Sequence, residues 1–329
     1  MQALVIEPVE PSDKSPRVSG ARRGVIRNVR FSERPGECRV RVTYAGICGT
    51  DLELLRGYAA YEGIPGHEFV GVVEDAPIGE QHWIGKRVVG EINAGCNSCE
   101  WCHAGICEHC PDRSVLGIVN RDGAFATHLS IPPQNLHEVP ASLADEVAVF
   151  VEPTAAACEI LTQVEVTPSS RVAIVGDGRL GLLVGQVLRS TGADVTLIGR
   201  HEDKLNFGNK LGLVTCSSND VLPHRSFDFT IDATGQPSGL RRALELVRPR
   251  GIVVMKSTFH GETPVSLWPA VVDEITLVGS RCGPFDKGIA MLKQGTVQTA
   301  PLVSGIFQLD DFGSAFDLAG RALKVLLKP

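Results

Sequence analysis

Residues 171–192, RVAIVGDGRLGLLVGQVLRSTG, decide the fold of the second half of the chain. The first five residues form a short apolar run typical of a buried strand, and apolar residues recur at helical spacing from Leu180 onward. A glycine-rich turn lies between them. This order predicts a dinucleotide site, because glycines let the backbone approach a pyrophosphate at a helix N-terminus. The predicted cofactor-binding residues of the turn are Gly176, Gly178, Leu180 and Gly181; a turn without a ligand is the alternative.

Alternation of strands and helices continues beyond this segment. Further strands are predicted at 194–198, 227–235, 251–256 and 275–280, with helices at 202–212 and 238–247. Apolar strands alternating with helices predict an α/β fold with a doubly wound parallel sheet, covered by helices on both faces. The domain is predicted to span 151–285.

The first half has a different pattern. Short strands are predicted at 39–46, 69–73, 86–92 and 124–131, separated by Gly, Pro and Asp. We expect a β-rich domain over 1–150, with a cysteine lobe at 91–112. The segment 286–329 ends in ALKVLLKP, a predicted strand that returns to the first domain.

The choice of cofactor is predicted from the residues that follow the second strand of the dinucleotide domain. An NAD site usually has Asp or Glu there, accepting a hydrogen bond from the ribose 2′-hydroxyl. This chain has Gly199, Arg200 and His201 instead. Glycine leaves room for a 2′-phosphate and Arg200 can pair with it, so NADP(H) is predicted over NAD(H). Alternatively, Arg200 only begins the next helix and faces water.

Composition limits the possible partners and location. The 329 residues carry a net charge of −6, which argues against nucleic acid or an anionic membrane as a partner. The N-terminal residues lack the basic and apolar regions of a signal peptide, and no apolar run is long enough to span a membrane. A reducing cytoplasm is therefore expected, where clustered cysteines bind metal more often than they form disulfides.

Five of the ten cysteines fall in residues 95–110, GCNSCEWCHAGICEHC. Four of them have the spacing C-x2-C-x2-C-x7-C, which suits a closed tetrahedral zinc site of structural type. A redox pair and an iron–sulfur cluster are the alternatives. The predicted ligands are Cys96, Cys99, Cys102 and Cys110, whereas Cys107, His103 and His109 are interpreted as surface residues.

A second metal centre is predicted from residues at the ends of other strands. GICGTD contains Cys48 and Thr50, GHE contains His67 and Glu68, and VEP contains Glu152. Each residue alone is more often packed in a core than bound to metal, but a cysteine and a histidine at separate strand ends can meet at one ion.

The order GICGTD, GHEFVG, the cysteine lobe, GAFATHL, VEPTAAA and GxGxxG resembles the zinc-dependent medium-chain dehydrogenase/reductase family over essentially the whole chain. The branch it most resembles contains sorbitol, glucose and threonine dehydrogenases. The resemblance implies a GroES-like β domain joined to a Rossmann domain. It also implies catalytic zinc on Cys48, His67 and either Glu68 or Glu152. Glu152 stands where alcohol dehydrogenases with a Cys₂His site have their second cysteine.

The resemblance further implies hydride transfer between an alcohol and a nicotinamide, with zinc as Lewis acid. Thr50 would pass the proton, Asp51 would orient His67, and Thr234 and 256–260 would lie near the cofactor. The usual relay histidine is replaced by Glu53. The segment 275–283 resembles a strand that pairs between subunits of a dimer or tetramer.

The substrate is expected to be a small alcohol, polyol or sugar-like molecule, or the matching carbonyl compound. Tyr58, Tyr61 and Phe285 are candidates for its pocket. A cofactor-binding regulatory protein without turnover and a zinc-free quinone reductase are the alternatives, and zinc content with turnover on a panel of alcohols separates them.

Overall fold

The computed structural model describes residues 1–8, 22–222, 224–258 and 263–329. They form two compact units, Met1–Glu152 with Ala300–Pro329, and Pro153–Thr299. The helix α10 (Phe285–Lys293) thus lies in the second unit. Residues 259 and 260 of the predicted cofactor segment lie outside the described residues. Within the described parts of the chain, no helix has the length and apolar composition needed to cross a bilayer.

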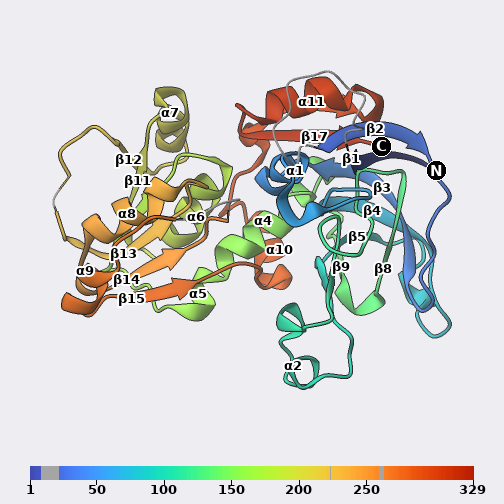
Figure 1. The fold of residues 1–329 in the computed structure, drawn as a ribbon, viewed down its shortest axis with the longest axis horizontal. Helices are drawn as coiled ribbons and strands as arrows, with labels where there is room; N and C mark the ends of the chain where they lie inside the picture. Colours follow the sequence, from blue (N-terminus) through green and yellow to red (C-terminus); the bar gives the residue numbers. More distant parts are fainter. Residues whose placement is uncertain (9–21, 223, 259–262) are drawn as a thin grey trace. The chain divides into compact units, whose positions relative to one another are not determined.

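The second unit is built on a parallel sheet (Figure 1). Its strands pair in the order β12-β11-β10-β13-β14-β15. The order reverses between β10 and β13, the point at which doubly wound sheets bind their ligands. This confirms the predicted fold class. The strand bounds are β10 Arg171–Val175, β11 Asp194–Gly199, β12 Val214–Ser217, β13 Phe227–Asp232, β14 Val247–Met255 and β15 Thr276–Gly279.

Helices connect these strands. α6 packs on β10 and β11, and α8 packs on β10, β13 and β14. Right-handed crossovers that run in opposite directions from the reversal point place these two helices on opposite faces of the sheet. The helix bounds are α4 Val151–Cys158, α5 Ile160–Gln163, α6 Arg179–Arg189, α7 Glu202–Lys210, α8 Pro237–Leu246 and α9 Trp268–Val272.

The first unit contains a mostly antiparallel sheet of order β16-β17-β3-β4-β5-β9, with β8 also paired to β3. The C-terminal strand β17 lies between β16 and β3, so residues 324–328 complete the sheet that the first half of the chain begins. The strand bounds are β3 Cys38–Gly46, β4 Glu68–Asp75, β5 Arg87–Gly90, β8 His128–Ile131, β9 Leu136–Glu138, β16 Val303–Gln308 and β17 Lys324–Lys328.

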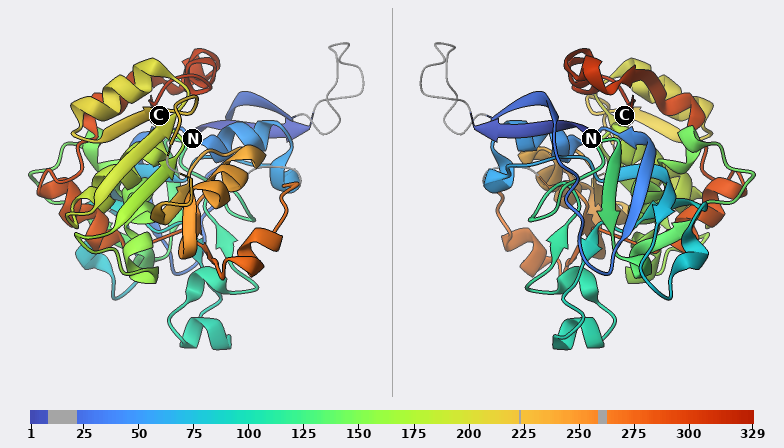
Figure 2. Two further views of the ribbon diagram at one scale, coloured as in Figure 1. Left: turned by 90° about the vertical axis from the view of Figure 1, so that its left-hand side faces the viewer. Right: turned by 90° about the vertical axis from the view of Figure 1, so that its right-hand side faces the viewer.

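Smaller elements surround this sheet. The hairpin pairs β1 (Gln2–Pro8) with β2 (Arg22–Asn28), and a short pair joins β6 (Asn93–Ala94) to β7 (Ser114–Val115). The cysteine lobe between β6 and β7 extends away from the sheet of its unit in both views of Figure 2, where it is teal. The helices of this unit are α1 Gly49–Leu55, α2 Glu100–His103, α3 Asp145–Ala148 and α11 Phe312–Ala319.

One predicted strand is shorter than expected. Residues 124–131 were predicted as one strand, but β8 begins only at His128. The preceding residues bond instead to the turn before His67: the amide of Ala124 donates to the Gly66 carbonyl (2.9 Å) and the amide of Phe125 to the Pro65 carbonyl (3.0 Å). Alternating hydrophobicity does not distinguish such an irregular pairing from a regular strand.

Candidate active site

Three of the predicted metal ligands meet where β3 ends and β4 begins. In the antiparallel register Gly46 is opposite Glu68, so Cys48, just past β3, lies beside His67, just before β4. One ligand atom from each of Cys48, His67 and Glu68 lies within 4.8 Å of the other two. The sequence brings them together through strand register, although 19 positions separate Cys48 from His67.

The turn before His67 is held by close packing. Gly66 has a φ of +97°, and a Cβ on it would lie 2.5 Å from Cδ1 of Phe125. Glycine is required on both counts, because a side chain would be strained at this φ and would collide with the ring. Phe125 of the GAF motif thus packs against the turn that precedes His67 of the GHE motif.

Asp51 serves two neighbours at this site. Its Oδ2 accepts a hydrogen bond from the Cys48 amide at 2.7 Å and so caps α1. Its Oδ1 lies 3.5 Å from Nδ1 of His67, and both of these buried atoms lack a hydrogen-bond partner. Asp51 therefore caps α1 and also lies beside the ring of His67, the neighbour that the resemblance implies.

The surroundings of His67 favour a positive charge. Burial lowers the pKa of His67, but the negative charges of Asp51 and Cys48 raise it more, so the pKa stands well above its ordinary value. A proton or a metal cation can supply that charge. Cys48 offers a sulfur donor and His67 an imidazole nitrogen, and both lie near the carboxylate of Glu68. This donor set fits zinc.

Glu68 is held by a partner that the sequence analysis missed. Its Oε2 makes an ion pair with Nζ of Lys324 at the start of β17, and the two side chains are 1% and 0% exposed. The ammonium also donates to the Ile47 carbonyl at 3.4 Å and lies 5.5 Å from the ring centroid of Phe150. The one available signal was a lysine inside the apolar run ALKVLL.

The other carboxylate and the predicted relay residues are placed differently. Glu152 lies in the first turn of α4 and is not part of the group with atoms within 4.8 Å. Oγ1 of Thr50 is 3.9 Å from Sγ of Cys48. Glu53 makes an ion pair with the exposed guanidinium of Arg56 at 2.5 Å, which is typical of a solvated helix surface.

The four predicted lobe cysteines also meet, with their sulfur atoms within 4.8 Å of one another. Sγ of Cys99 and Sγ of Cys110 are 3.7 Å apart, too far for a disulfide and close to the roughly 3.8 Å expected of two sulfurs on one tetrahedral zinc. The hydrogen bonds from Ser98 lower the pKa of Cys96 to about 6, which favours the thiolate that a metal needs. Cys107, His103 and His109 stand outside this group.

The glycine turn of the second unit is closely packed on one side and open on the other. A Cβ on Gly181 would lie 1.9 Å from the Gly176 carbonyl oxygen, and one on Gly176 would lie 2.6 Å from the Ala233 carbonyl oxygen. A Cβ on Gly178 would meet no atom within 4 Å. The open side at the start of α6 leaves the backbone accessible to a pyrophosphate, so the turn fits a dinucleotide.

The neighbouring loops contain the other predicted cofactor residues. Thr234 follows β13, and its hydroxyl donates to Oδ1 of Asp232 at 2.8 Å. Gly199 ends β11, but the space expected beside it for a 2′-phosphate holds the carboxylate of Asp177: a Cβ on Gly199 would lie 2.3 Å from Oδ2 of that residue. Arg200 and His201 are exposed.

Two of the proposed substrate-pocket residues belong to the packed interior. Tyr61 is 6% exposed, packs with Ile6 and Leu54, and donates its hydroxyl to the Ile64 carbonyl at 2.7 Å. Phe285 is 3% exposed at the start of α10. Tyr58 is partly buried against the same cluster as Tyr61. Sequence pattern alone does not indicate which aromatic side chains face solvent.

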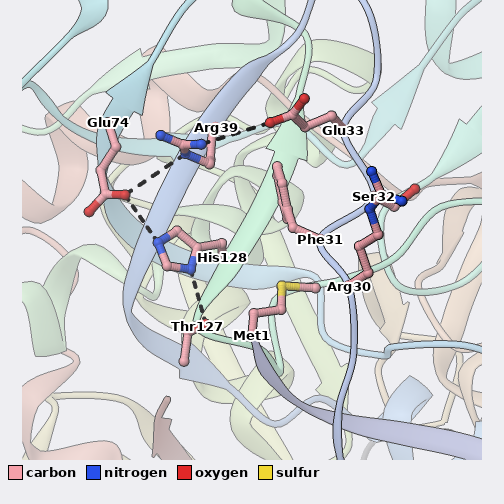
Figure 3. A pocket seen from close by; sticks show the side chains of 9 residues that line it. All are labelled: Met1, Arg30, Phe31, Ser32, Glu33, Arg39, Glu74, Thr127 and His128. Atoms are coloured by element: carbon pink, nitrogen blue, oxygen red, sulfur yellow. Dashed lines mark hydrogen bonds and ion pairs between the residues drawn. The ribbon is translucent and has the colours of Figure 1, made fainter.

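A pocket of about 870 Å³ lies elsewhere in the first unit (Figure 3). Its charged side chains pair with one another: Arg39 lies 3.8 Å from Glu33 and 3.9 Å from Glu74, and Nε2 of His128 lies 3.1 Å from Oε2 of Glu74. Cys48 and His67 are not among its lining residues. Size alone therefore does not identify the reactive centre.

Two known domain families match this chain, and each covers one of the two sites. The alcohol dehydrogenase GroES-like domain matches residues 34–141, which include Cys48, His67 and the cysteine lobe. The zinc-binding dehydrogenase domain matches residues 180–295, which include α6 after its first residue and the whole of β11. The chain belongs to the zinc-dependent medium-chain dehydrogenase/reductase family. It is accordingly an NAD(P)-dependent dehydrogenase of the alcohol dehydrogenase type.

Several relatives of this dehydrogenase cover most of the chain. A 2-dehydro-3-deoxy-L-galactonate 5-dehydrogenase of Pseudoalteromonas atlantica is 28% identical over 309 residues, 89% of this chain and 90% of that protein. The structure of the E. coli alcohol dehydrogenase RspB with NADH has a TM-score of 0.87 at 26% identity, covering 100% of this chain and 99% of that one. A zinc-binding dehydrogenase of Sinorhizobium meliloti, solved with NADP, has a TM-score of 0.82 at 26% identity over 93% and 96% of the chains.

The buried ion pair generates a stability prediction. Lys324→Met removes the ammonium but keeps much of the side-chain volume, so Glu68 stays buried with an uncompensated charge. We expect a loss of about 3–5 kcal/mol in the stability of the first unit, measured by urea denaturation. Lys328→Met, at the exposed end of the same strand, is the control and should change stability little. The double variant Lys324→Met with Glu68→Gln should recover much of the loss; a Lys324→Met protein as stable as the wild type would contradict the pairing.

Proposed function

We propose that this dehydrogenase interconverts a secondary alcohol, polyol or sugar-like alcohol and its carbonyl compound, using zinc held by Cys48 and His67. The observation that carries the proposal is the convergence of Cys48, His67 and Glu68 within 4.8 Å, at the junction of β3 and β4. The names of relatives support this substrate class, since they include sorbitol, D-arabinitol and L-threonine dehydrogenases.

Cys48 and His67 would bind the metal directly. Zinc bound there would supply Lewis acidity toward a hydroxyl oxygen, and a bound nicotinamide would supply the hydride chemistry. Asp51 faces Nδ1 of His67 at 3.5 Å, so it favours the tautomer that keeps Nε2 available as a ligand. This is the usual task of a carboxylate behind a metal-bound histidine.

The roles of the two glutamates differ in this proposal. Lys324 neutralises Glu68 and holds its Oε2, which limits the negative charge that Glu68 presents to a cation. Glu152 remains the other candidate ligand by resemblance. Because the ion pair already satisfies Glu68, we propose that Glu68 lies near the metal without being its permanent ligand.

Thr50 would carry the proton. Its hydroxyl lies 3.9 Å from Sγ of Cys48 and can both accept and donate a hydrogen bond, as a relay requires. Glu53, which is paired with Arg56 at the surface, is not needed for this first step.

The cysteine lobe would hold a second, structural zinc ion through Cys96, Cys99, Cys102 and Cys110. Four thiolate donors leave no coordination position for substrate. The proposal includes a reducing compartment such as the cytoplasm, in which the ten cysteines of the described structure stay free of disulfides.

The choice between NAD(H) and NADP(H) depends on a few residues around Gly199. The composition of 199–201 favours NADP(H), whereas relatives have been solved with either NADH or NADP. The carboxylate of Asp177, however, lies beside Gly199, where the 2′-phosphate of NADP(H) is expected to bind.

A homo-oligomer is also proposed. The helix α9 and the residue before it expose apolar side chains beside the edge strand β15: Trp268 is 67% exposed and Val271 79%. Such neighbouring apolar groups are typical of an interface between subunits.

Zinc analysis combined with kinetics tests the proposed reaction. His67→Asn should reduce zinc from two ions per chain to one and abolish oxidation across a panel of polyols, secondary alcohols, aldoses and threonine. Thr50→Val should keep both ions but lower turnover by about 10²-fold or more, because only the proton path is lost. Full zinc content with normal turnover in His67→Asn would contradict the proposal. A wild-type enzyme with two zinc ions and bound cofactor, but without turnover on any alcohol, would favour a regulatory protein.

The cysteine lobe gives a prediction with an internal control. Cys110→Ser should lower zinc by one ion per chain and reduce the melting temperature, because structural zinc contributes directly to folding. Cys107→Ser changes the same kind of residue in the same lobe and should leave zinc content unchanged. Equal zinc loss in both variants would show that the four-cysteine assignment is wrong.

The interface prediction concerns mass in solution. Trp268→Glu introduces a charge into the proposed contact and should convert dimers or tetramers into smaller species, as measured by light scattering during gel filtration. Val221→Glu, at a fully exposed apolar residue of the same unit, should leave the mass unchanged. A wild-type monomer, or an unchanged mass for Trp268→Glu, would contradict this interface.

A further inference from the structure

The carboxylate of Asp177 occupies the end of β11 although it belongs to the glycine turn after β10. A Cβ on Gly199 would lie 2.3 Å from its Oδ2 and 2.6 Å from its Cγ. A side chain at 199 and the side chain of Asp177 therefore exclude each other. The glycine at 199 is explained by Asp177, so it does not by itself indicate room for a phosphate.

Asp177 also takes the hydrogen-bond donors around that position. Its Oδ2 accepts from the amides of Arg200 and His201, both at 2.7 Å, and its Oδ1 lies 3.0 Å from Nδ1 of His201. These amides precede α7, where an anion is stabilised by unpaired N–H groups. The anion in this structure is an internal carboxylate.

The charge on Asp177 is maintained despite burial. The residue is 6% exposed. Desolvation raises the pKa of Asp177, but hydrogen bonds from His201 and Arg200 outweigh it and lower the pKa below its ordinary value. At neutral pH the carboxylate beside Gly199 is thus ionised, as it is in sites with an acid at the end of the second strand.

We propose that Asp177 supplies, from the glycine turn, the carboxylate that other dinucleotide sites carry at the end of the second strand, and that it makes the chain select NAD(H) over NADP(H). The inference rests on the proposed function only for the presence of a nicotinamide cofactor. It reverses the order of preference expected from residues 199–201, because a 2′-phosphate would meet a fixed negative charge and amides that are already bonded. Arg200 is exposed and can attract a phosphate, so it is the competing determinant.

Direct binding measurements test this selectivity without turnover. We expect NADH to bind the zinc-loaded wild-type protein at least about tenfold more tightly than NADPH in fluorescence titrations, which corresponds to about 1.4 kcal/mol. Asp177→Asn keeps the side-chain size but removes the charge, and should reduce this ratio by about tenfold. The ratio of the two dissociation constants does not depend on the fraction of folded protein, so partial misfolding of the variant does not obscure it.

Asp203→Asn is the matched control. Asp203 lies in the first turn of α7 and is exposed, so the substitution changes net charge equally near the same loop and should leave the ratio unchanged. Arg200→Ala should weaken NADPH binding much less than Asp177→Asn strengthens it. Tighter binding of NADPH by the wild type, or an unchanged ratio in Asp177→Asn, would overturn the proposal and favour Arg200 as the determinant.

Exchanging Asp177 and Gly199 tests whether the carboxylate has the same effect on cofactor choice when β11 carries it. Gly199→Asp alone should impair NADH binding, because the new side chain collides with Asp177. Adding Asp177→Gly should restore NADH binding and its preference over NADPH, since the carboxylate then comes from β11. Failure of the double variant to regain NADH selectivity, in a protein with a wild-type melting temperature, would contradict the equivalence. Absence of alcohol oxidation would affect only the proposed reaction, since every readout here is binding.

Discussion

The candidate metal centre depends on the buried ion pair between Glu68 and Lys324. These residues are 256 positions apart in sequence, and both are almost completely removed from solvent. Neither charge is stable in the interior alone, because desolvation of one ion costs several kcal/mol. The pair therefore couples the docking of the C-terminal strand β17 to the position of β4, and β4 begins directly after His67.

Both sites use a glycine to admit a carboxylate from a distant segment. At the metal centre, a Cβ on Gly46 would lie 2.4 Å from Oε2 of Glu68 and 2.9 Å from Cε of Lys324. At the dinucleotide turn, Gly199 gives the same room to Asp177. In each case the glycine is needed because it leaves space for a buried carboxylate, and not because of its backbone freedom. That carboxylate sets the local electrostatics of the site.

Local patterns predicted the dinucleotide fold and the four lobe cysteines that the structure brings together, whereas the grouping of Cys48, His67 and Glu68 at one centre was implied by the family resemblance. Short apolar strands and a glycine turn specify β10 and α6 within about 20 residues of sequence, and the cysteine lobe is a single loop. Contacts between side chains from distant segments could not be predicted from these patterns. Lys324 and Asp177 act on residues outside their own segments, and residues 124–127 pair irregularly with the turn at Gly66. Periodicity also could not separate Tyr61, which is packed in the core, from an aromatic residue of a pocket.

We propose that one zinc ion lies between Cys48 and His67 while Lys324 holds Glu68. Anomalous diffraction from crystals of the zinc-loaded enzyme, collected above and below the zinc absorption edge, tests it most directly. We expect two peaks per chain, one among the sulfurs of Cys96, Cys99, Cys102 and Cys110 and one bonded to Sγ of Cys48 and the imidazole of His67. A fully folded, zinc-loaded chain with no peak between Cys48 and His67 would contradict it.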